Sequence, residues 1–179
     1  MFKRSLGLEK LTVKKLCVLA MLTALTAVLA IYCTFRVGTL IKIPLKFITV
    51  FISAALFGPV WGGVVALLGD ILNAVLMPVG LFLPQVSAVE FLYGFIFGLF
   101  YYKKYNKGYI KNTILCALLL TLIDLFLMSY ILTTVGIFAN FAMAVTMRFA
   151  ASLIKFALYI LICLLLKKHL VSFERLMNK

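Results

Sequence analysis

Acidic residues are scarce in this chain of 179 residues, which holds 5 aspartates and glutamates against 18 lysines and arginines. Charged residues of both signs make up 13% of the sequence, well short of the quarter that is usual in soluble domains. Hydrophobic residues reach 65%, and the mean hydropathy is +1.18. This composition excludes a soluble globular protein and indicates an integral membrane protein.

Histidine is almost absent, because the sequence contains only His169, close to its C-terminal end. A zinc site of the H-E-x-x-H type is therefore excluded, and the sequence has no P-loop and no G-x-S-x-G nucleophile motif. The cysteines form no C-x-x-C pair and lie in apolar segments, so we expect neither a disulfide nor a metal site. We expect no catalytic residues, no enzyme activity, no cofactor and no ATP hydrolysis by the chain itself.

The formal net charge is +13, a value that would suggest a nucleic-acid partner for a soluble chain. Here the basic residues lie mainly between the apolar runs and at the two ends of the sequence. In such positions they set the orientation of a membrane protein and contact anionic lipid headgroups. We therefore expect the lipid bilayer as the surroundings of the chain and no nucleic acid as a partner.

Six apolar segments predict an all-α integral membrane protein, a six-transmembrane-helix bundle in a single domain. Glycine and proline separate some of these segments, at Gly58-Pro59 and at Pro78-Val79-Gly80. The second segment is short for a bilayer core of roughly 30 Å. The predicted helices cover residues 16–35, 45–57, 60–77, 84–102, 112–135 and 140–166.

Six crossings place both chain ends on the same side of the membrane. The basic residues of segments 1–15, 103–111 and 167–179 then share that side, which the positive-inside rule assigns to the cytoplasm. The sequence thus predicts a multi-pass membrane protein with both termini cytoplasmic.

The first outward loop breaks this rule, because it carries Arg36, Lys42 and Lys46. One explanation is that these side chains simply extend to lipid headgroups. The other is that they attract and hold an anionic solute that arrives from outside.

Ionisable residues inside the predicted helices indicate a functional site. Each such group costs several kcal/mol in a bilayer unless it faces a partner or a wet cavity. They are Asp70, Glu90, Asp124, Arg148 and Lys155. At a rise of about 1.5 Å per residue, most of them lie in the outer half of the membrane. This clustering predicts an outward-opening polar cavity, although ion pairs such as Arg148 with Asp124 could instead lock the bundle together.

Polar neighbours extend this set, since Asn73 lies one helical turn from Asp70 and Tyr93 follows Glu90 on the fourth segment. We combine them with the buried charges and the cations of the first outward loop. The predicted substrate-binding residues are Arg36, Lys42, Lys46, Asn73, Glu90, Tyr93, Asp124 and Arg148.

Small residues recur on one face of the first predicted helix, at Ala20, Ala24 and Ala27. Gly94 and Gly98 show a similar spacing in the fourth. Small residues at such spacing let helices approach closely in lipid. Most stripes of this kind serve packing within a bundle, but the alanine stripe could also be a docking face for another membrane protein.

Two stretches and the alanine stripe carry a resemblance to a known family. Residues 56–70, LFGPVWGGVVALLGD, resemble the signature of the substrate-binding (S) components of energy-coupling factor (ECF) transporters, and are closest to the folate-family members. Residues 82–88, FLPQVSA, followed by Gly94 and Gly98, are similar to that family's fourth segment. The pair Ala20 and Ala24 matches the A-x-x-x-A element by which such components dock onto the transmembrane coupling subunit.

The resemblance implies a subunit that captures a vitamin, in the first place folate, from outside the cell. It also implies a transmembrane coupling subunit and two ABC ATPases as partners. The carboxylates of folate could be bound by Arg36, Lys42, Lys46 and Arg148. Asp124 or Asn73 could hydrogen-bond its pterin. Phe35, Trp61 and Tyr93 are candidates to stack on the pterin ring.

The sequence is also compatible with other functions. Related S components take riboflavin, thiamine, pantothenate or queuosine-type bases. A stand-alone small transporter or channel would carry coupling residues near the membrane midplane, where Asp124 and Lys155 come closest. A structural membrane subunit without a ligand would have its buried charges paired off.

Overall fold

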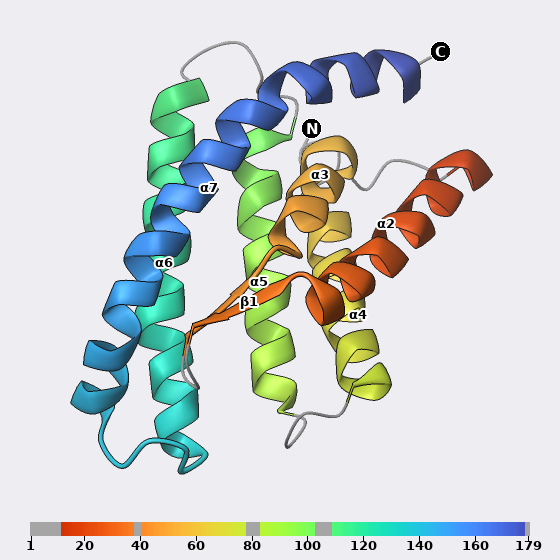
Figure 1. The fold of residues 1–179 in the computed structure, drawn as a ribbon. Coiled ribbons are helices and arrows are strands. Elements are labelled where there is room, and N and C mark those ends of the chain that lie inside the picture. The colour runs from red at the N-terminus through yellow and green to blue at the C-terminus, as the bar shows by residue number, and fades with distance from the viewer. Residues whose placement is uncertain (1–11, 38–40, 78–82, 103–108, 178–179) are drawn as a thin grey trace.

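The structure is a computed structural model that describes residues 12–37, 41–77, 83–102 and 109–177, without the side chains of residues 35–37, 41–44 and 168–177. Within these ranges the chain forms six helices and one two-stranded hairpin (Figure 1). The helices are α2 (Val13–Tyr32), α3 (Phe47–Phe57), α4 (Pro59–Leu76), α5 (Pro84–Tyr101), α6 (Tyr109–Thr134) and α7 (Phe141–Met177). The strands are β1 (Thr34–Val37) and β2 (Ile41–Pro44). The predicted six-helix bundle is confirmed, with the hairpin as an addition.

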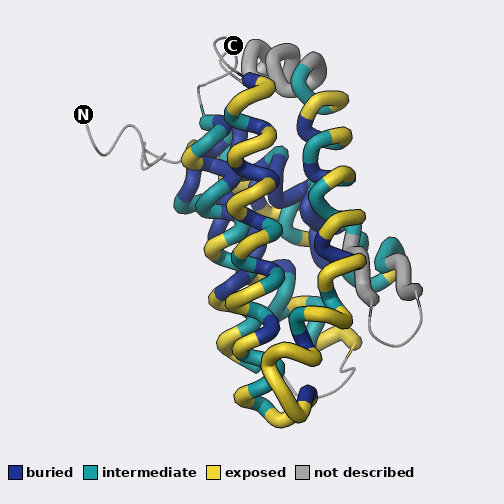
Figure 2. Tube along the Cα trace, turned by 90° about the vertical axis from the view of Figure 1, so that its left-hand side faces the viewer, coloured by how far each residue is buried: buried dark blue, intermediate teal, exposed yellow. Residues whose placement is uncertain are grey.

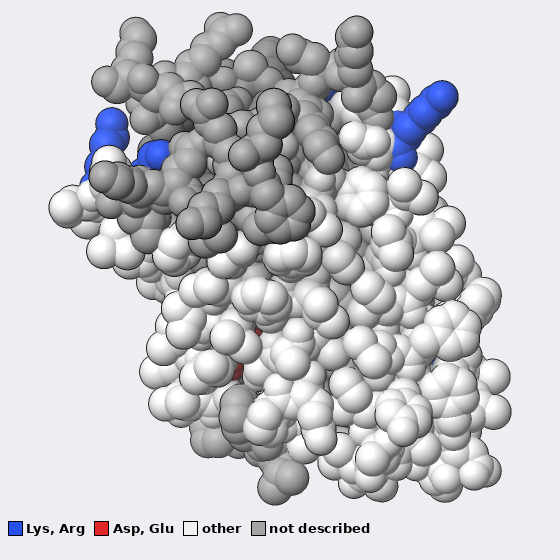
Figure 3. Space-filling model, turned by 180° about the vertical axis from the view of Figure 1, so that it is seen from behind, with Lys and Arg blue, Asp and Glu red and all other residues white. Residues whose placement is uncertain are grey.

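Four of the described helices are long and apolar enough to cross a membrane: α2, α4, α6 and residues 141–167 of α7. Their outward side chains are mostly large and apolar, as contact with lipid requires. Figure 2 shows this exposed outer surface around a buried interior, and Figure 3 shows a face with almost no charged side chains below its upper rim. The chain is therefore built as a membrane protein.

The helix α3 is too short to cross the bilayer alone, because 11 residues span about 17 Å at 1.5 Å per residue. It begins part-way through the bundle and is followed directly by α4, with Gly58 between them at φ 100°. Such a φ strains any residue with a Cβ, so glycine is needed at this turn. The start of α2 and the end of α7 lie at the same end of the molecule, at the top of Figure 1.

The hairpin corrects two expectations. The first helix ends at Tyr32 and not at residue 35, and two strands, β1 and β2, lie in the segment that was expected to be the first outward loop. The strands pair antiparallel, with Thr34 opposite Pro44 and Arg36 opposite Lys42. A run that contains β-branched and aromatic residues favours this extended pairing, which satisfies backbone groups inside the molecule. The hairpin follows the end of α2, where β1 contacts α2, and β2 contacts α7 (Figure 1).

The last helix is longer than the predicted 140–166, because α7 continues to Met177. Residues 167–177 contain no glycine or proline and are rich in lysine, leucine and other good helix formers. Loss of apolar character marks the end of the membrane span and does not by itself end a helix.

Glycine holds α4 and α5 in close contact. A Cβ on Gly94 would overlap the carbonyl oxygen of Gly62, and a Cβ on Gly98 would overlap the backbone of Pro59. The spacing of Gly94 and Gly98 therefore serves packing within the bundle, the first of the two functions considered for such stripes.

An aromatic cluster fills the interior between α3, α5 and α7. The ring of Phe51 meets Phe97 edge to face at 5.5 Å between centroids, and Phe47 meets Tyr159 in the same way at 4.9 Å. Such pairs stabilise a core beyond the burial of their area. This cluster forms one wall of the cavity described next.

Candidate functional site

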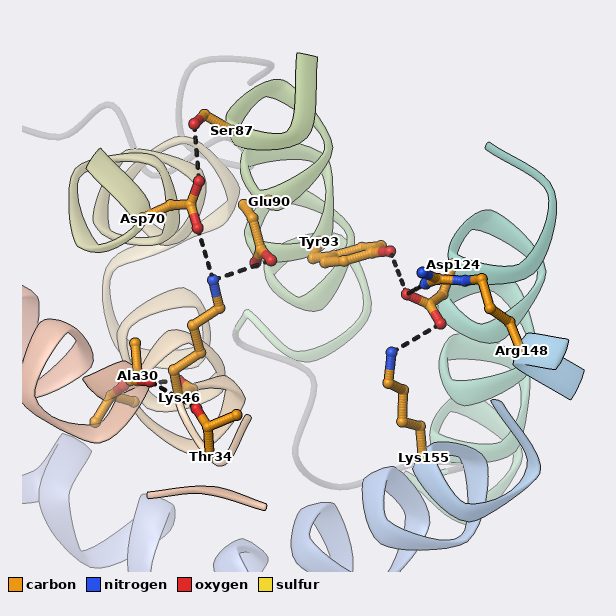
Figure 4. A network of polar contacts seen from close by, with 11 residues as sticks. Ala30, Thr34, Lys46, Asp70, Ser87, Glu90, Tyr93, Asp124, Arg148 and Lys155 are labelled. Atoms are coloured by element: carbon orange, nitrogen blue, oxygen red, sulfur yellow. Dashed lines mark hydrogen bonds and ion pairs between the residues drawn. The ribbon is translucent and has the colours of Figure 1, made fainter. Parts of the chain in front are cut away.

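Lys46 is the centre of a first group of buried charges, here called the Lys46 cluster (Lys46, Asp70, Ser87, Glu90). Its ammonium Nζ lies 3.0 Å from Asp70 Oδ1 and 3.0 Å from Glu90 Oε1 (Figure 4). The hydroxyl of Ser87 donates to Asp70 Oδ2 at 2.8 Å. The cluster joins the start of α3 to α4 and α5. In it, two carboxylates share one ammonium.

Asp124 is the centre of a second group, here called the Asp124 cluster (Tyr93, Asp124, Arg148, Ser152, Lys155). Its Oδ1 accepts from Arg148 Nη2 at 3.1 Å and from the Tyr93 hydroxyl at 3.2 Å. Its Oδ2 accepts from Lys155 Nζ at 2.9 Å and from Ser152 Oγ at 3.5 Å. Here the composition is reversed, because two cations share one carboxylate that is buried on α6.

A cavity of about 390 Å³ lies between these two clusters. Pockets for small molecules have volumes of this order and combine apolar walls with a few fixed polar groups. The charged residues that line it are Lys46, Glu90, Asp124, Arg148 and Lys155. The aromatic residues that line it are Phe47, Tyr93, Phe97, Phe138 and Tyr159. The ring of Tyr93 lies between Glu90 and Asp124, and its hydroxyl points to Asp124 (Figure 4).

The cavity brings together five members of the predicted binding set: Lys46, Glu90, Tyr93, Asp124 and Arg148. Lys46 differs from expectation, because it is only 7% exposed and does not lie on a surface loop. Its place at the start of the short helix α3 puts it inside the bundle, where the two carboxylates attract it. The ion pair of Arg148 with Asp124, considered as a structural lock, is present.

Other members of the predicted set lie elsewhere. Asn73 is half-buried on α4 and is not among the described residues that line the cavity. The side chains of Phe35, Arg36 and Lys42 lie outside the described ones. Trp61 packs against the cluster of Leu19, Phe57 and Val65 and is not among the described residues that line the cavity, so its contact with a ligand stays a prediction.

The alanine stripe of α2 is divided by the fold. Ala20 and Ala24 are exposed, but Ala27 is only 3% exposed and lies beside Gly69 of α4. An external docking face can therefore include Ala20 and Ala24, and the expectation for Ala27 is corrected by its burial in the chain's own packing.

The aromatic wall was not predicted from the sequence, and Lys155 was not in the predicted binding set. Phe47, Phe97 and Tyr159 are too common as core residues for their positions to indicate a cavity. Lys155 carried a usable signal, because Arg148, Ser152 and Lys155 recur at i, i+4 and i+7 on one face of α7.

Comparisons with known proteins agree with this architecture. Residues 14–167 match the family described as "ECF transporter, substrate-specific component". The crystal structure of FolT bound with folic acid is similar, with a TM-score of 0.78 and 27% sequence identity over 88% of this chain and 95% of that one.

The structure of the S component of a bacterial ECF transporter is also similar, with a TM-score of 0.62 and 27% identity over 89% of this chain and 96% of that one. No curated protein sequence matches the chain. The family match covers most of the sequence, and the members of that family are substrate-binding transport components and not enzymes. This chain therefore belongs to the substrate-specific components of ECF transporters, as the resemblance in residues 56–70 indicates.

Proposed function

We propose that the chain is the high-affinity binding subunit of a vitamin importer in the bacterial plasma membrane and that its ligand is folate or a folate-like vitamin. The observation that carries this proposal is the cavity between the Lys46 and Asp124 clusters, in a chain similar to FolT bound with folic acid. Aromatic walls suit a flat heterocycle, and paired charges suit its polar edges. The proposed ligand-binding residues are Lys46, Glu90, Tyr93, Asp124, Arg148 and Lys155.

The proposal includes delivery of the vitamin through partners. A transmembrane coupling subunit and two ABC ATPases would supply the energy, because this sequence has no P-loop. The exposed Ala20 and Ala24 would meet the coupling subunit. Arg36 and Lys42, which oppose each other across the hairpin, would meet the vitamin as it arrives.

Binding of folic acid to the purified full chain is the direct test. Small molecules that co-purify with the protein are identified by mass spectrometry, and binding of added folic acid is measured by calorimetry. A cavity-filling variant, Ala151→Phe, and its neighbour Ala150→Phe form a matched pair. Ala151 lines the cavity and is buried, whereas Ala150 is exposed on the same helix.

We expect Ala151→Phe to abolish folic acid binding and Ala150→Phe to leave it unchanged. Equal affinity in both variants would contradict binding in this cavity. One alternative has an observation in its favour, since the ion pairs would also suit a structural subunit without a ligand. That alternative predicts no bound vitamin and no binding of any added vitamin.

A further inference from the structure

The two clusters carry opposite surplus charges. In the Lys46 cluster, Asp70 and Glu90 share the single ammonium of Lys46. In the Asp124 cluster, Arg148 and Lys155 share the single carboxylate of Asp124. With all these groups ionised, the described residues leave one negative charge in excess at one end of the cavity and one positive charge in excess at the other.

The excess charges lie on groups that are largely buried and face the cavity. The side chains of Glu90 and Arg148 are each 15% exposed, and both line it. In a medium of low dielectric, an unmatched charge is costly unless a partner arrives. Each surplus therefore favours a complementary group on a ligand.

Arg148 also has a hydrogen-bond donor to spare. Its Nη2 donates to Asp124, whereas its Nε is buried and has no hydrogen-bond partner among the described residues. A guanidinium offers donors in a fixed fork that matches a carboxylate. An acceptor group on a ligand would satisfy this donor and the surplus positive charge together.

From these contacts we propose that the cavity binds an amphoteric ligand in one orientation, with a ligand carboxylate at Arg148 and Lys155 and ligand N–H donors at Glu90. This inference rests on the proposed function of vitamin capture and specifies the class and orientation of the vitamin. The aromatic rings that line the cavity between the two ends would contact a flat middle portion of the ligand.

The two surplus charges can be removed without orphaning a buried ion. Arg148→Gln leaves Asp124 paired with Lys155, and Glu90→Gln leaves Lys46 paired with Asp70. Each variant thus keeps a neutral pair, so the fold is expected to persist. Lys111→Gln, at an exposed position near the start of α6, is the control for loss of one charge outside the cavity.

Binding is measured by calorimetry on the purified full chain with three probes. Folic acid offers both ends, its dimethyl ester lacks the free carboxylates, and an analogue with methyl in place of the 2-amino group lacks the two N–H donors of that amino group. We expect Arg148→Gln to weaken folic acid binding by about 30-fold and to have little effect on the ester, because an ion pair is lost only with the acid. We expect Glu90→Gln to weaken folic acid by about tenfold and to have little effect on the methyl analogue.

The reverse pattern, with Arg148→Gln sensitive to the amino group and Glu90→Gln sensitive to the esters, would overturn the orientation. Equal losses for all three probes, or losses as large in Lys111→Gln, would overturn it as well. Binding of pantothenate, riboflavin and thiamine is measured as well. These measurements show whether a failure concerns the orientation of the ligand or only the identification of the vitamin as folate.

If the protein binds pantothenate and not folic acid, the folate assignment fails while the carboxylate site stands, provided that Arg148→Gln weakens pantothenate and spares its methyl ester. Binding of riboflavin or thiamine alone would overturn the inference while vitamin capture stands, because neither has a carboxylate. Binding of none of the four would overturn both.

Discussion

Lys46 shows how the molecule keeps charge inside a bilayer. Its ammonium contacts two carboxylates at 3.0 Å, and the Ser87 hydroxyl donates to one of them, that of Asp70. Taking ions out of water costs several kcal/mol each, and only close partners offset that cost. The same holds for Asp124 with Arg148 and Lys155. At the residue scale, removal of the ion that two opposite charges share should therefore destabilise the protein more than removal of one of those two charges.

Lys46→Met should destabilise the protein strongly, because Asp70 and Glu90 would lose the cation that both of them contact. Breaking a buried pair in this way costs about 3–5 kcal/mol. Thermal unfolding of the purified protein in detergent, followed by tryptophan fluorescence, measures the effect. Glu90→Gln is the control and should unfold close to the wild-type temperature. A Lys46→Met protein as stable as wild type would contradict the shared-ammonium arrangement.

At the scale of elements, two helix contacts depend on glycine. The first is the glycine contact of α4 with α5, where Gly94 lies against Gly62. The second is the contact of α2 with α4, where Gly69 lies under Thr26 and the hydroxyl of Thr26 also donates to Thr49 of α3 at 2.8 Å. Small residues allow these helices to approach closely. Without them, the members of the Lys46 cluster on α3, α4 and α5 would lie too far apart to form their ion pairs.

Gly94→Val should lower the stability of the fold by about 1–3 kcal/mol or more, because its side chain would push α5 away from the Gly62 backbone. Leu92→Val is the matched control, since Leu92 lies on α5 and is partly exposed. Folded yield and thermal unfolding in detergent report the difference. Equal stability of the two variants would show that the α4–α5 contact is looser than described.

Tryptophan substitutions along α2 separate docking from folding. Ala20→Trp and Ala24→Trp should prevent co-purification with the coupling subunit while ligand binding persists, because both positions are exposed. Ala27→Trp should instead lower the folded yield, since this residue is buried beside Gly69. Leu122→Trp, exposed on α6, is the control. Normal assembly of the Ala20 and Ala24 variants would remove this face from the interface.

The elements also show what the sequence could predict. Apolar length and the Gly58-Pro59 break sufficed for six helices, because these signals are local. The hairpin from Thr34 to Pro44 was missed, because strands of 4 residues carry only a weak β-propensity signal beside a long apolar run. Burial of Lys46 was missed because it depends on Asp70 and Glu90, 24 and 44 positions further along the chain.

At the scale of the whole molecule, an apolar exterior surrounds a charged interior. Exposed leucine, isoleucine, phenylalanine and methionine cover the outward faces of the described helices, whereas the ionised groups of both clusters point inward. This distribution is the opposite of that in a soluble protein and suits a component that holds a polar solute within the membrane.

Orientation in the membrane is a prediction at this scale. With the native cysteines replaced by serine or alanine, Ile137→Cys should react with an impermeant maleimide added outside intact cells. Lys111→Cys should react only after the membrane is opened. Both positions are exposed and lie between helices or near a helix start. Labelling of position 111 from outside would reverse the predicted cytoplasmic position of both termini.

The central claim is that this chain captures a carboxylated vitamin in the cavity between the Lys46 and Asp124 clusters. Calorimetry of folic acid binding to the purified wild-type chain and to Ala151→Phe tests it most directly. We predict tight binding of one folic acid per chain to wild type, and none to the variant with the filled cavity. Absence of binding to wild type, or undiminished binding to a folded Ala151→Phe protein, would contradict the claim.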